Sequence, residues 1–215
     1  TGEPMSRHTT FRIGGPADYY VAPRRPETFG KLMAYCRDGG LDFLALGNGS
    51  NLLVSGAGIR GVVASTAGLR GLHAAPGDDG SVSLGCGAGL SLREVCVAAR
   101  ERALMGLEFA YGIPGSVGGA VYMNAGAYGG EMKDVTVSAG YVGNGKSGCL
   151  TGEELGFGYR RSAFTDGRRA VTEAVFRLRP GDRERIARRM EELMGRRVSK
   201  QPLELPSAGS GFRRP

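Results

Sequence analysis

A stretch dense in glycine, GIPGSVGGAVYMNAGAYGGE at 112–131, constrains the fold of this chain more than any other part of its sequence. Glycine loses more conformational entropy on folding than any other residue, so such a stretch indicates backbone that turns tightly or lies against another group. Residues 114–116 are expected to form a tight turn. Residues 118–124 are then expected to form a short helical turn whose free N–H groups point back at it, a geometry that holds phosphate. The stretch therefore predicts a surface for an anionic ligand.

A second loop of the same kind, Gly-Asn-Gly-Ser-Asn at 47–51, follows a predicted strand at 41–46. It offers many N–H donors and short polar side chains, which suit an anion. An ordinary Gly/Asn turn is the alternative for this loop taken alone. Apolar residues at 52–54 and 62–64 come next, so we expect the polar loop to be embedded between buried strands. That placement favours a pyrophosphate over a bare turn.

Two further glycine-rich patterns are not interpreted as nucleotide sites. GCGAGL at 85–90 lacks the third glycine of a dinucleotide fingerprint, and no βαβ unit surrounds it. We instead expect Ser91 to cap a helix, with Glu94 as the reciprocal member of a capping box.

GYVGNGKS at 140–147 fits the P-loop pattern, but no helical period follows it. Asn144-Gly145 is therefore predicted to be a hairpin turn.

Local signals predict several other elements. Residues 9–23 are expected to form two short strands around a Gly-Gly-Pro turn. Apolar residues at helical spacing predict a helix over 26–37, and a strand is expected over 170–178. Asp182 is expected to cap a second helix. The apolar face of this helix is Ile186, Met190, Leu193 and Met194.

Composition excludes several classes of protein. No apolar run approaches the roughly 18 residues that span a bilayer, and the polar start lacks a signal peptide, so a cytoplasmic protein without membrane contact is expected. Four scattered cysteines and two histidines predict reduced thiols and no metal site. The net charge of +7 invites a nucleic-acid partner, but the basic residues are spread along the chain without interleaved aromatics. Anionic cofactors and substrates account for the same charge, and a monomer is expected.

Five motifs occur in order along residues 9–215: TTFRIGGPAD, GNGSNLLVS, GIPGSVGGAVYMNAGAYGGE, FGYRRSAF and QPLELPSAGSGFRRP. Together they resemble the UDP-N-acetylenolpyruvoylglucosamine reductases, FAD-dependent enzymes of bacterial peptidoglycan precursor synthesis. The resemblance implies an α+β, two-subdomain FAD-binding fold of the vanillyl-alcohol oxidase type. It divides the chain into a first FAD-binding subdomain (1–66), a second (67–180), and a connecting helix that begins a third, substrate-binding domain (181–215). The glycine motif corresponds to the shorter of the family's two types.

The resemblance also implies a hydride relay. NADPH would reduce FAD, and the flavin would reduce the enolpyruvyl group of a UDP-linked amino sugar, UDP-N-acetylglucosamine enolpyruvate, to give UDP-N-acetylmuramate. Arg160 matches the family's catalytic arginine, whose planar fork suits a carboxylate that gains negative charge. Ser210 matches the proton donor, with Lys200 placed to ease loss of the hydroxyl proton, and Tyr159 would contact substrate. Without the resemblance, Tyr159 and Arg160 could equally be a cation packed on a surface aromatic, and Ser210 an ordinary loop serine.

For FAD, the resemblance and the two glycine-rich stretches indicate three groups of residues. The first would bind the pyrophosphate, the second would run along the diphosphate and ring, and the third would line the flavin side. These residues are Gly47, Asn48, Gly49, Ser50 and Asn51; Gly112, Ile113, Pro114, Gly115, Ser116, Gly118 and Gly119; and Asn124, Ala125 and Gly126.

The sequence departs from the family in one respect. Family members continue past FRRP into a further α+β substrate-binding domain that carries a catalytic glutamate, and these 215 residues contain neither. Two alternatives stay open beside the reductase. One is an FAD-binding oxidase or dehydrogenase of the same wider flavoprotein group, and the other is a flavin-binding fragment without turnover.

Overall fold

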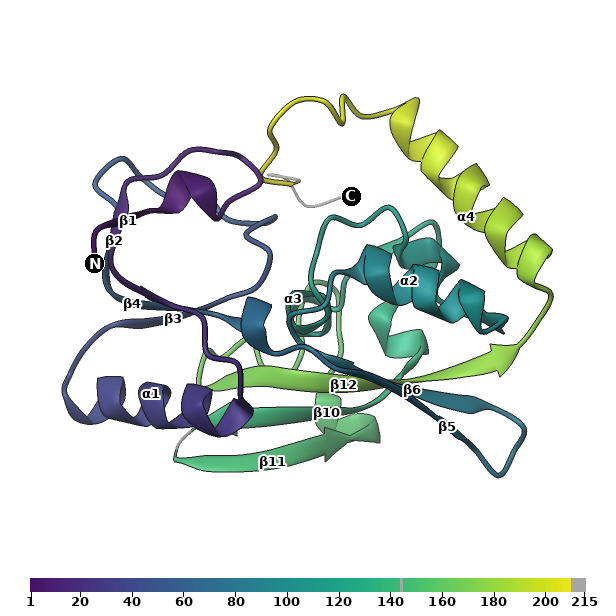
Figure 1. The fold of residues 1–215 in the computed structure, drawn as a ribbon, viewed down its shortest axis with the longest axis horizontal. Helices are drawn as coiled ribbons and strands as arrows, with labels where there is room; N and C mark the ends of the chain where they lie inside the picture. The colour runs from purple at the N-terminus through teal and green to yellow at the C-terminus, as the bar shows by residue number, and fades with distance from the viewer. Residues whose placement is uncertain (144, 210–215) are drawn as a thin grey trace.

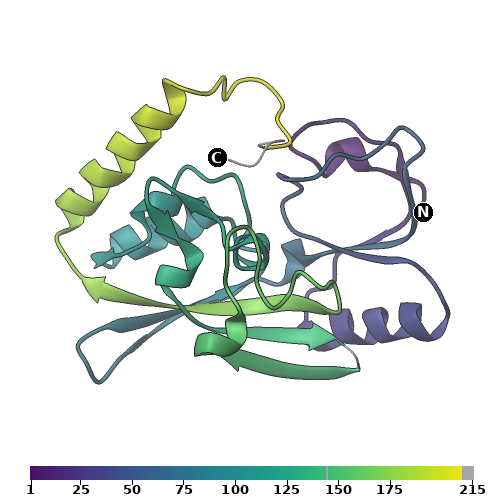
Figure 2. The ribbon, with the colours of Figure 1, turned by 180° about the vertical axis from the view of Figure 1, so that it is seen from behind.

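Two β-sheets, each with an apolar core, form the framework of the chain in a computed structural model that describes residues 1–143 and 145–209 (Figures 1 and 2). The first sheet has the order β1-β2-β4-β3, and β4 runs parallel to both of its neighbours. Its strands are β1 (Glu3–Pro4), β2 (Pro16–Val21), β3 (Phe43–Leu46) and β4 (Ile59–Ser65). Its small core contains Met5, Ala17, Leu46, Val54 and Val63.

The second sheet is larger and antiparallel, with the order β11-β10-β12-β6-β5 and a short β7 that also pairs with β12. Its strands are β5 (Leu72–Pro76), β6 (Val82–Gly87), β7 (Leu104–Met105), β10 (Thr136–Gly143), β11 (Lys146–Thr151) and β12 (Arg169–Pro180). A separate hairpin, β8 (Gly126–Ala127) and β9 (Gly130–Glu131), ends the glycine-rich stretch. The long strand β12 lies between β10 and β6 and carries the fully buried Phe176.

Four α-helices and five short 3₁₀ turns complete the fold of the described residues. The helices are α1 (Pro26–Asp38), α2 (Leu92–Glu101), α3 (Val117–Met123) and α4 (Arg183–Val198). The 3₁₀ turns are η1 (Met5–Arg7), η2 (Thr66–Gly68), η3 (Glu108–Ala110), η4 (Met132–Asp134) and η5 (Gly152–Leu155). Helix α4 packs against η3 and α2, and α3 packs against β12. The mixture of helices and sheets confirms the predicted α+β class.

The caps predicted for the helices are confirmed. Ser91 and Glu94 form the capping box of α2, with the Ser91 Oγ accepting from the Glu94 N–H at 3.1 Å and the Glu94 carboxylate accepting from the Ser91 N–H at 2.8 Å. The Ser91 N–H and the Ser91 hydroxyl both donate to the Glu94 carboxylate and hold its pKa below the ordinary value. Asp182 caps α4 by accepting from the Arg185 N–H at 2.6 Å. Helix α1 begins at Pro26, as its sequence predicts.

Helix α1 joins the two sheets. It lies within the predicted first subdomain, but it contacts β10 and β11 of the second sheet, alongside which Figure 1 shows it. Its Phe29 is fully buried in the larger core. Along the chain, the first sheet ends just before the predicted boundary at 66/67, and the second sheet ends at the predicted boundary at 180/181. The division into subdomains stays a prediction.

Two predicted strands are wrong. Residues 9–15 form a turn because the Thr9 hydroxyl donates to the Ile13 carbonyl at 3.0 Å and the Arg12 N–H donates to the Thr9 carbonyl at 3.1 Å. Residues 52–54 lie outside the described strands, and Leu53 is 67% exposed. The loop at 47–51 therefore follows β3, an edge strand in which only Leu46 is buried, and does not lead directly into another strand.

The hairpin predicted in place of a P-loop is confirmed on both sides of its turn. Strands β10 and β11 pair antiparallel, with Gly143 opposite Lys146. Asn144, the first residue of the predicted turn, lies outside the described residues.

The four cysteines differ in burial. All are free, and Cys149 alone is exposed. Burial raises the pKa of Cys86 to about 12 and also raises the pKa of Cys36 and Cys96. Because the thiolate is the reactive form, we expect one thiol per folded chain to react rapidly with Ellman's reagent at pH 8 and all four to react after denaturation. A Cys149→Ser variant is the control, since its rapid phase should vanish; a persistent rapid phase would contradict the described burial.

Candidate cofactor and active site

The two glycine-rich loops, 47–51 and 112–119, meet in the structure. The Asn48 side-chain amide donates to the Pro114 carbonyl at 2.8 Å across 66 positions of sequence. A Cβ added to Gly47 would lie 2.7 Å from the Ser116 Oγ, so the Gly47 backbone approaches the Ser116 side chain as closely as the absence of its own side chain permits. The structure thus brings together the two stretches that the sequence singles out separately.

Backbone donors remain available where these loops meet. The N–H groups of residues 48–51 make no hydrogen bond within 1–143 and 145–209, and neither does the N–H of Ser116, a residue that is only 4% exposed. Ser116 pairs with Ser91 through an isolated antiparallel bridge whose bonds use the flanking residues. Its own N–H therefore points away from Ser91. A cluster of unpaired backbone donors, one on a buried residue, fits the oxygens of a pyrophosphate.

The predicted role of the α3 N–H groups is wrong. The Val117 N–H donates to the Leu90 carbonyl at 2.8 Å, and the Gly118 N–H donates to the Ala88 carbonyl at 2.9 Å. These two N–H groups are not available to a ligand, because residues 88–90, which precede α2, pack on the start of α3. A Cβ on Gly118 would lie 2.9 Å from the Ala88 Cβ, so this glycine allows protein packing. The donors left for an anion come from the two loops.

Gly49 is the most constrained glycine of the first loop. Its φ is +61°, and an added Cβ would overlap the His8 carbonyl oxygen. The Gly49 carbonyl also accepts from the Thr10 N–H at 3.2 Å. The backbone of 47–51 is therefore held against the turn near the N-terminus and cannot shift independently of it.

The segment that follows α4 returns to this same loop (Figures 1 and 2). The Ser207 N–H donates to the Thr10 carbonyl at 3.2 Å, and the Thr10 hydroxyl donates to the Ser207 carbonyl. A Cβ on Gly209 would lie 3.2 Å from the Asn51 Oδ1. Ser210, the predicted proton donor, lies outside the described residues, but the chain immediately before it is placed beside the predicted pyrophosphate loop.

Arg160 lies in a two-residue turn between Gly158 and Arg161, which exchange hydrogen bonds of 3.0 and 3.2 Å. Its φ of +56° is unusual for a residue with a side chain. The Arg160 guanidinium carbon lies 5.2 Å from the centre of the Tyr159 ring. The alternative of a cation packed on a surface aromatic is thus realised, and both side chains are exposed. Exposure leaves the guanidinium accessible to an anionic ligand.

Lys200 was expected to act on Ser210, which lies outside the described residues. Lys200 follows the C-terminal end of α4, is exposed, and donates its backbone N–H to the Arg197 carbonyl at 3.1 Å. Arg197 in turn lies on the glycine-rich stretch, since a Cβ on Gly112 would be 3.0 Å from the Arg197 Cδ. No local pattern in the sequence signals this contact of Arg197.

The third predicted group, 124–126, includes a side chain that is already fully engaged. The Asn124 amide nitrogen donates to the Glu131 Oε2 at 2.9 Å and to the Gly158 carbonyl at 3.0 Å, and its oxygen accepts from the Lys133 N–H at 3.0 Å. The Lys133 ammonium contacts the same Glu131 Oε2 at 3.0 Å. The bond from Lys133 and the Asn124 amide hold the pKa of Glu131 below its ordinary value, and Arg160 lowers it further through space. Glu131 and Lys133 were not predicted from the sequence, because no local pattern signals these contacts.

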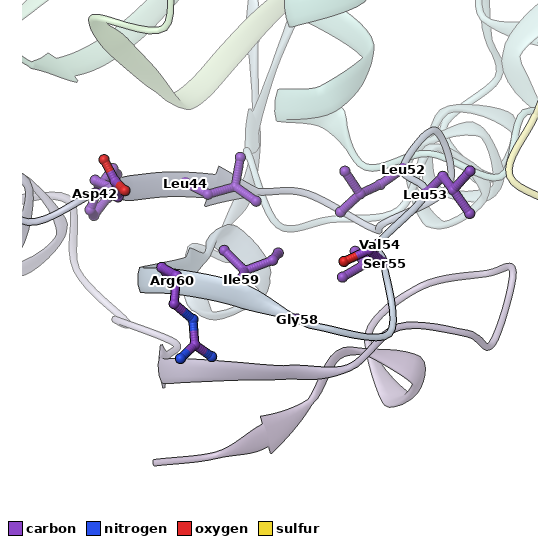
Figure 3. Close-up of a pocket in the computed structure, with 10 residues that line it drawn as sticks. Asp42, Leu44, Leu52, Leu53, Val54, Ser55, Gly58, Ile59 and Arg60 are labelled. Atoms are coloured by element: carbon purple, nitrogen blue, oxygen red, sulfur yellow. The ribbon is translucent and has the colours of Figure 1, made fainter.

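A surface groove of about 520 Å³ lies elsewhere, on the first sheet (Figure 3). Leu44 and Ile59 from neighbouring strands line it together with Leu52, and Asp42 and Arg60 lie at one end. None of the predicted cofactor residues lines this groove. It is therefore separate from the meeting point of the two loops.

Two classes of feature are absent from the part of the chain that the structure describes. Within 1–143 and 145–209 there is no group of three or more His, Cys, Asp or Glu side chains that could hold a metal ion. Among the helices described there, none combines the length and the apolar character required to cross a membrane.

Comparison with known proteins agrees with this geometry. A family model for an FAD binding domain matches residues 17–145. The UDP-N-acetylenolpyruvoylglucosamine reductase of Lachnoclostridium phytofermentans is 46% identical over 215 residues, which are 99% of this chain and 69% of that protein. That of Staphylococcus saprophyticus is 45% identical over 214 residues, 99% of this chain and 68% of that protein.

Solved structures give the same result. The UDP-N-acetylenolpyruvylglucosamine reductase of Thermus caldophilus superposes with a TM-score of 0.80 at 35% identity, covering 99% of this chain and 73% of that one. A cholesterol oxidase of Brevibacterium sterolicum, at 16% identity and a TM-score of 0.59, covers 74% of this chain and 34% of that one and shares the fold alone. The predicted FAD-binding fold of the vanillyl-alcohol oxidase type is confirmed. The chain, which spans about 69% of the length of its curated relative, belongs to the UDP-N-acetylenolpyruvoylglucosamine reductase family and carries its FAD-binding domain.

Proposed function

We propose that this protein catalyses the NADPH-dependent reduction of UDP-N-acetylglucosamine enolpyruvate to UDP-N-acetylmuramate, with FAD as the bound cofactor, in peptidoglycan precursor synthesis. The observation that carries the proposal is the meeting of the two glycine-rich loops, joined by the bond from Asn48 to Pro114 and lined by unpaired N–H groups. Membership of the reductase family supports the identity of the substrate.

The residues present fit FAD. Backbone N–H groups of 48–51 and Ser116 would bind the pyrophosphate oxygens, because charged acceptors strengthen such bonds and no protein acceptor competes for them within the described residues. Residues 112–115 and Gly119 would extend this surface, and Gly118 supports it by packing on Ala88. The backbone of 124–126 is the expected border on the flavin side. When bound, FAD supplies hydride transfer between the nicotinamide and the enolpyruvyl group.

The protein's remaining task is to bind the substrate carboxylate and to supply a proton. The Arg160 guanidinium, exposed on its turn, would pair with that carboxylate and stabilise the negative charge that develops on its oxygens. Tyr159 would pack against the substrate from the same turn. Ser210 would donate the proton to the substrate carbon next to the carboxylate, with Lys200 easing its release.

The test is an anaerobic two-step experiment on the purified chain with FAD. NADPH is expected to bleach the flavin absorbance, and the enolpyruvyl sugar nucleotide is then expected to restore it. NADH in place of NADPH tests the nicotinamide preference. Bleaching without recovery would instead favour a flavin-binding protein without turnover, while failure to bleach would contradict the proposal at its first step.

A further inference from the structure

The Asn124 side chain connects two parts of the site that are distant in sequence. Asn124 follows the last residue of α3, has a left-handed φ of +43° and is only 1% exposed. Its amide makes three hydrogen bonds, to Glu131, Lys133 and Gly158, which use both of its N–H groups and its oxygen. An amide so engaged has no N–H left to donate to a cofactor.

The bond to Gly158 holds the turn that carries Arg160. The Gly158 carbonyl accepts from the Asn124 amide at 3.0 Å and from the Arg161 N–H at 3.2 Å. A second attachment lies just beyond the turn, where the buried Ser162 hydroxyl donates to the Tyr122 carbonyl at 2.8 Å. Both attachments end on α3 or its cap, so this end of the helix serves as the base of the turn.

The Asn124 amide is itself held in place from the other side. Glu131, at the end of β9, accepts from the amide at 2.9 Å and from the Lys133 ammonium at 3.0 Å through the same oxygen. The Lys133 N–H fixes the amide oxygen at 3.0 Å. The orientation of the amide, and with it the donor aimed at Gly158, is therefore set by the β8–β9 hairpin and the turn that follows it.

We propose that Asn124 is a positioning residue for Arg160: its amide, oriented by Glu131 and Lys133, holds the Gly158–Arg161 turn so that the guanidinium is presented to the substrate carboxylate. The link to substrate rests on the proposed function. The placement of the turn rests on the hydrogen bonds alone.

A double variant, Asn124→Asp with Glu131→Gln, separates this role from general stability. The amide introduced at position 131 can donate to the carboxylate introduced at position 124, which still accepts from the Lys133 N–H. The number of charges and the contact between the two side chains are therefore kept. The Gly158 carbonyl, however, loses its side-chain donor, keeps the Arg161 N–H, and faces a carboxylate. Glu131→Gln alone is the matched control, since Asn124 can still donate to Gly158.

Trypsin cleavage after Arg160 or Arg161, quantified by mass spectrometry, reports on the turn. We expect cleavage in the double variant to be about tenfold faster than in the wild type, because the Gly158 carbonyl keeps only the Arg161 N–H and is repelled by the new carboxylate, which weakens the closed turn. The Glu131→Gln control should stay near the wild-type rate. Cleavage after the exposed Arg168, on a separate turn held by Asp166, is the internal reference for general loosening. Equal cleavage after Arg160 in all three proteins would overturn the proposal.

The functional arm compares the two flavin half-reactions. In the double variant, reoxidation by the enolpyruvyl nucleotide should slow about tenfold more than reduction by NADPH. Adding Arg160→Lys to the double variant should slow reoxidation little further, because the double variant and Arg160→Lys both act through the Arg160 guanidinium. Equal slowing of both half-reactions would overturn the role of Asn124 towards Arg160. If wild-type flavin is not reoxidised at all, the proposed function fails, and the cleavage comparison still decides whether Asn124 holds the turn.

Discussion

Gly49→Ala is expected to weaken FAD binding by about 100-fold or more, a loss equivalent to one or two charge-assisted hydrogen bonds. Gly49 has a φ of +61°, and its new Cβ would overlap the His8 carbonyl oxygen. Neither atom belongs to a flexible side chain, so the loop backbone must move. That movement would take the N–H groups of 48–51 away from the pyrophosphate. Quenching of flavin fluorescence during titration of the cofactor-free chain measures the change.

Gly80→Ala is the matched control for this variant. Gly80 has a similar φ of +74°, but its Cβ would meet nothing within 4 Å, and it lies between β5 and β6. It therefore carries the same conformational cost without the overlap. FAD should bind to this control as to the wild type. Equal affinity in both alanine variants would show that the first loop does not hold the cofactor.

Ser210→Ala is expected to slow flavin reoxidation by the enolpyruvyl nucleotide about 10²- to 10⁴-fold, the range typical of general acid catalysis. Reduction by NADPH should survive, because it needs no proton from this serine. The support from the described residues is the path of the chain: Ser207 bonds to Thr10, and Gly209 lies beside Asn51. Stopped-flow absorbance measures both half-reactions.

Ser207→Ala is the control from the same segment. The Ser207 hydroxyl accepts from the Gly209 N–H at 3.1 Å, so its loss loosens the segment without removing the predicted acid. We expect a loss of less than about tenfold in reoxidation, because one net hydrogen bond contributes on the order of 1 kcal/mol. A comparable loss in both variants, or equal loss of both half-reactions with Ser210→Ala, would contradict the assignment of Ser210.

Local signals in the sequence predicted the parts of the fold that local physics decides. Ser91 and Glu94 form the expected capping box, Asp182 caps α4, and Pro26 begins α1. Each depends on residues within one helical turn. The segment at 52–54 shows the limit of such signals, because apolar residues alone do not provide a neighbouring strand with which to pair.

Composition singled out the two glycine-rich loops of the candidate site, but it did not predict the contacts that join them. Both glycine-rich loops were found, yet the reason for Gly118 is its contact with Ala88, 30 positions earlier. The bond from Asn124 to Gly158 spans 34 positions and has no counterpart in any sequence pattern. An asparagine with positive φ after a helix is common, so its position was foreseeable whereas its partners were not. Tertiary packing decides which donors are left for a ligand.

The most direct measurement of the central claim, that the two glycine-rich loops together hold FAD, is a titration of the purified, cofactor-free chain with FAD. Flavin fluorescence would be followed, with circular dichroism confirming that the chain is folded. The structure predicts saturable binding of one FAD per chain with quenched fluorescence. A folded chain that leaves flavin fluorescence unchanged at every concentration would contradict the claim.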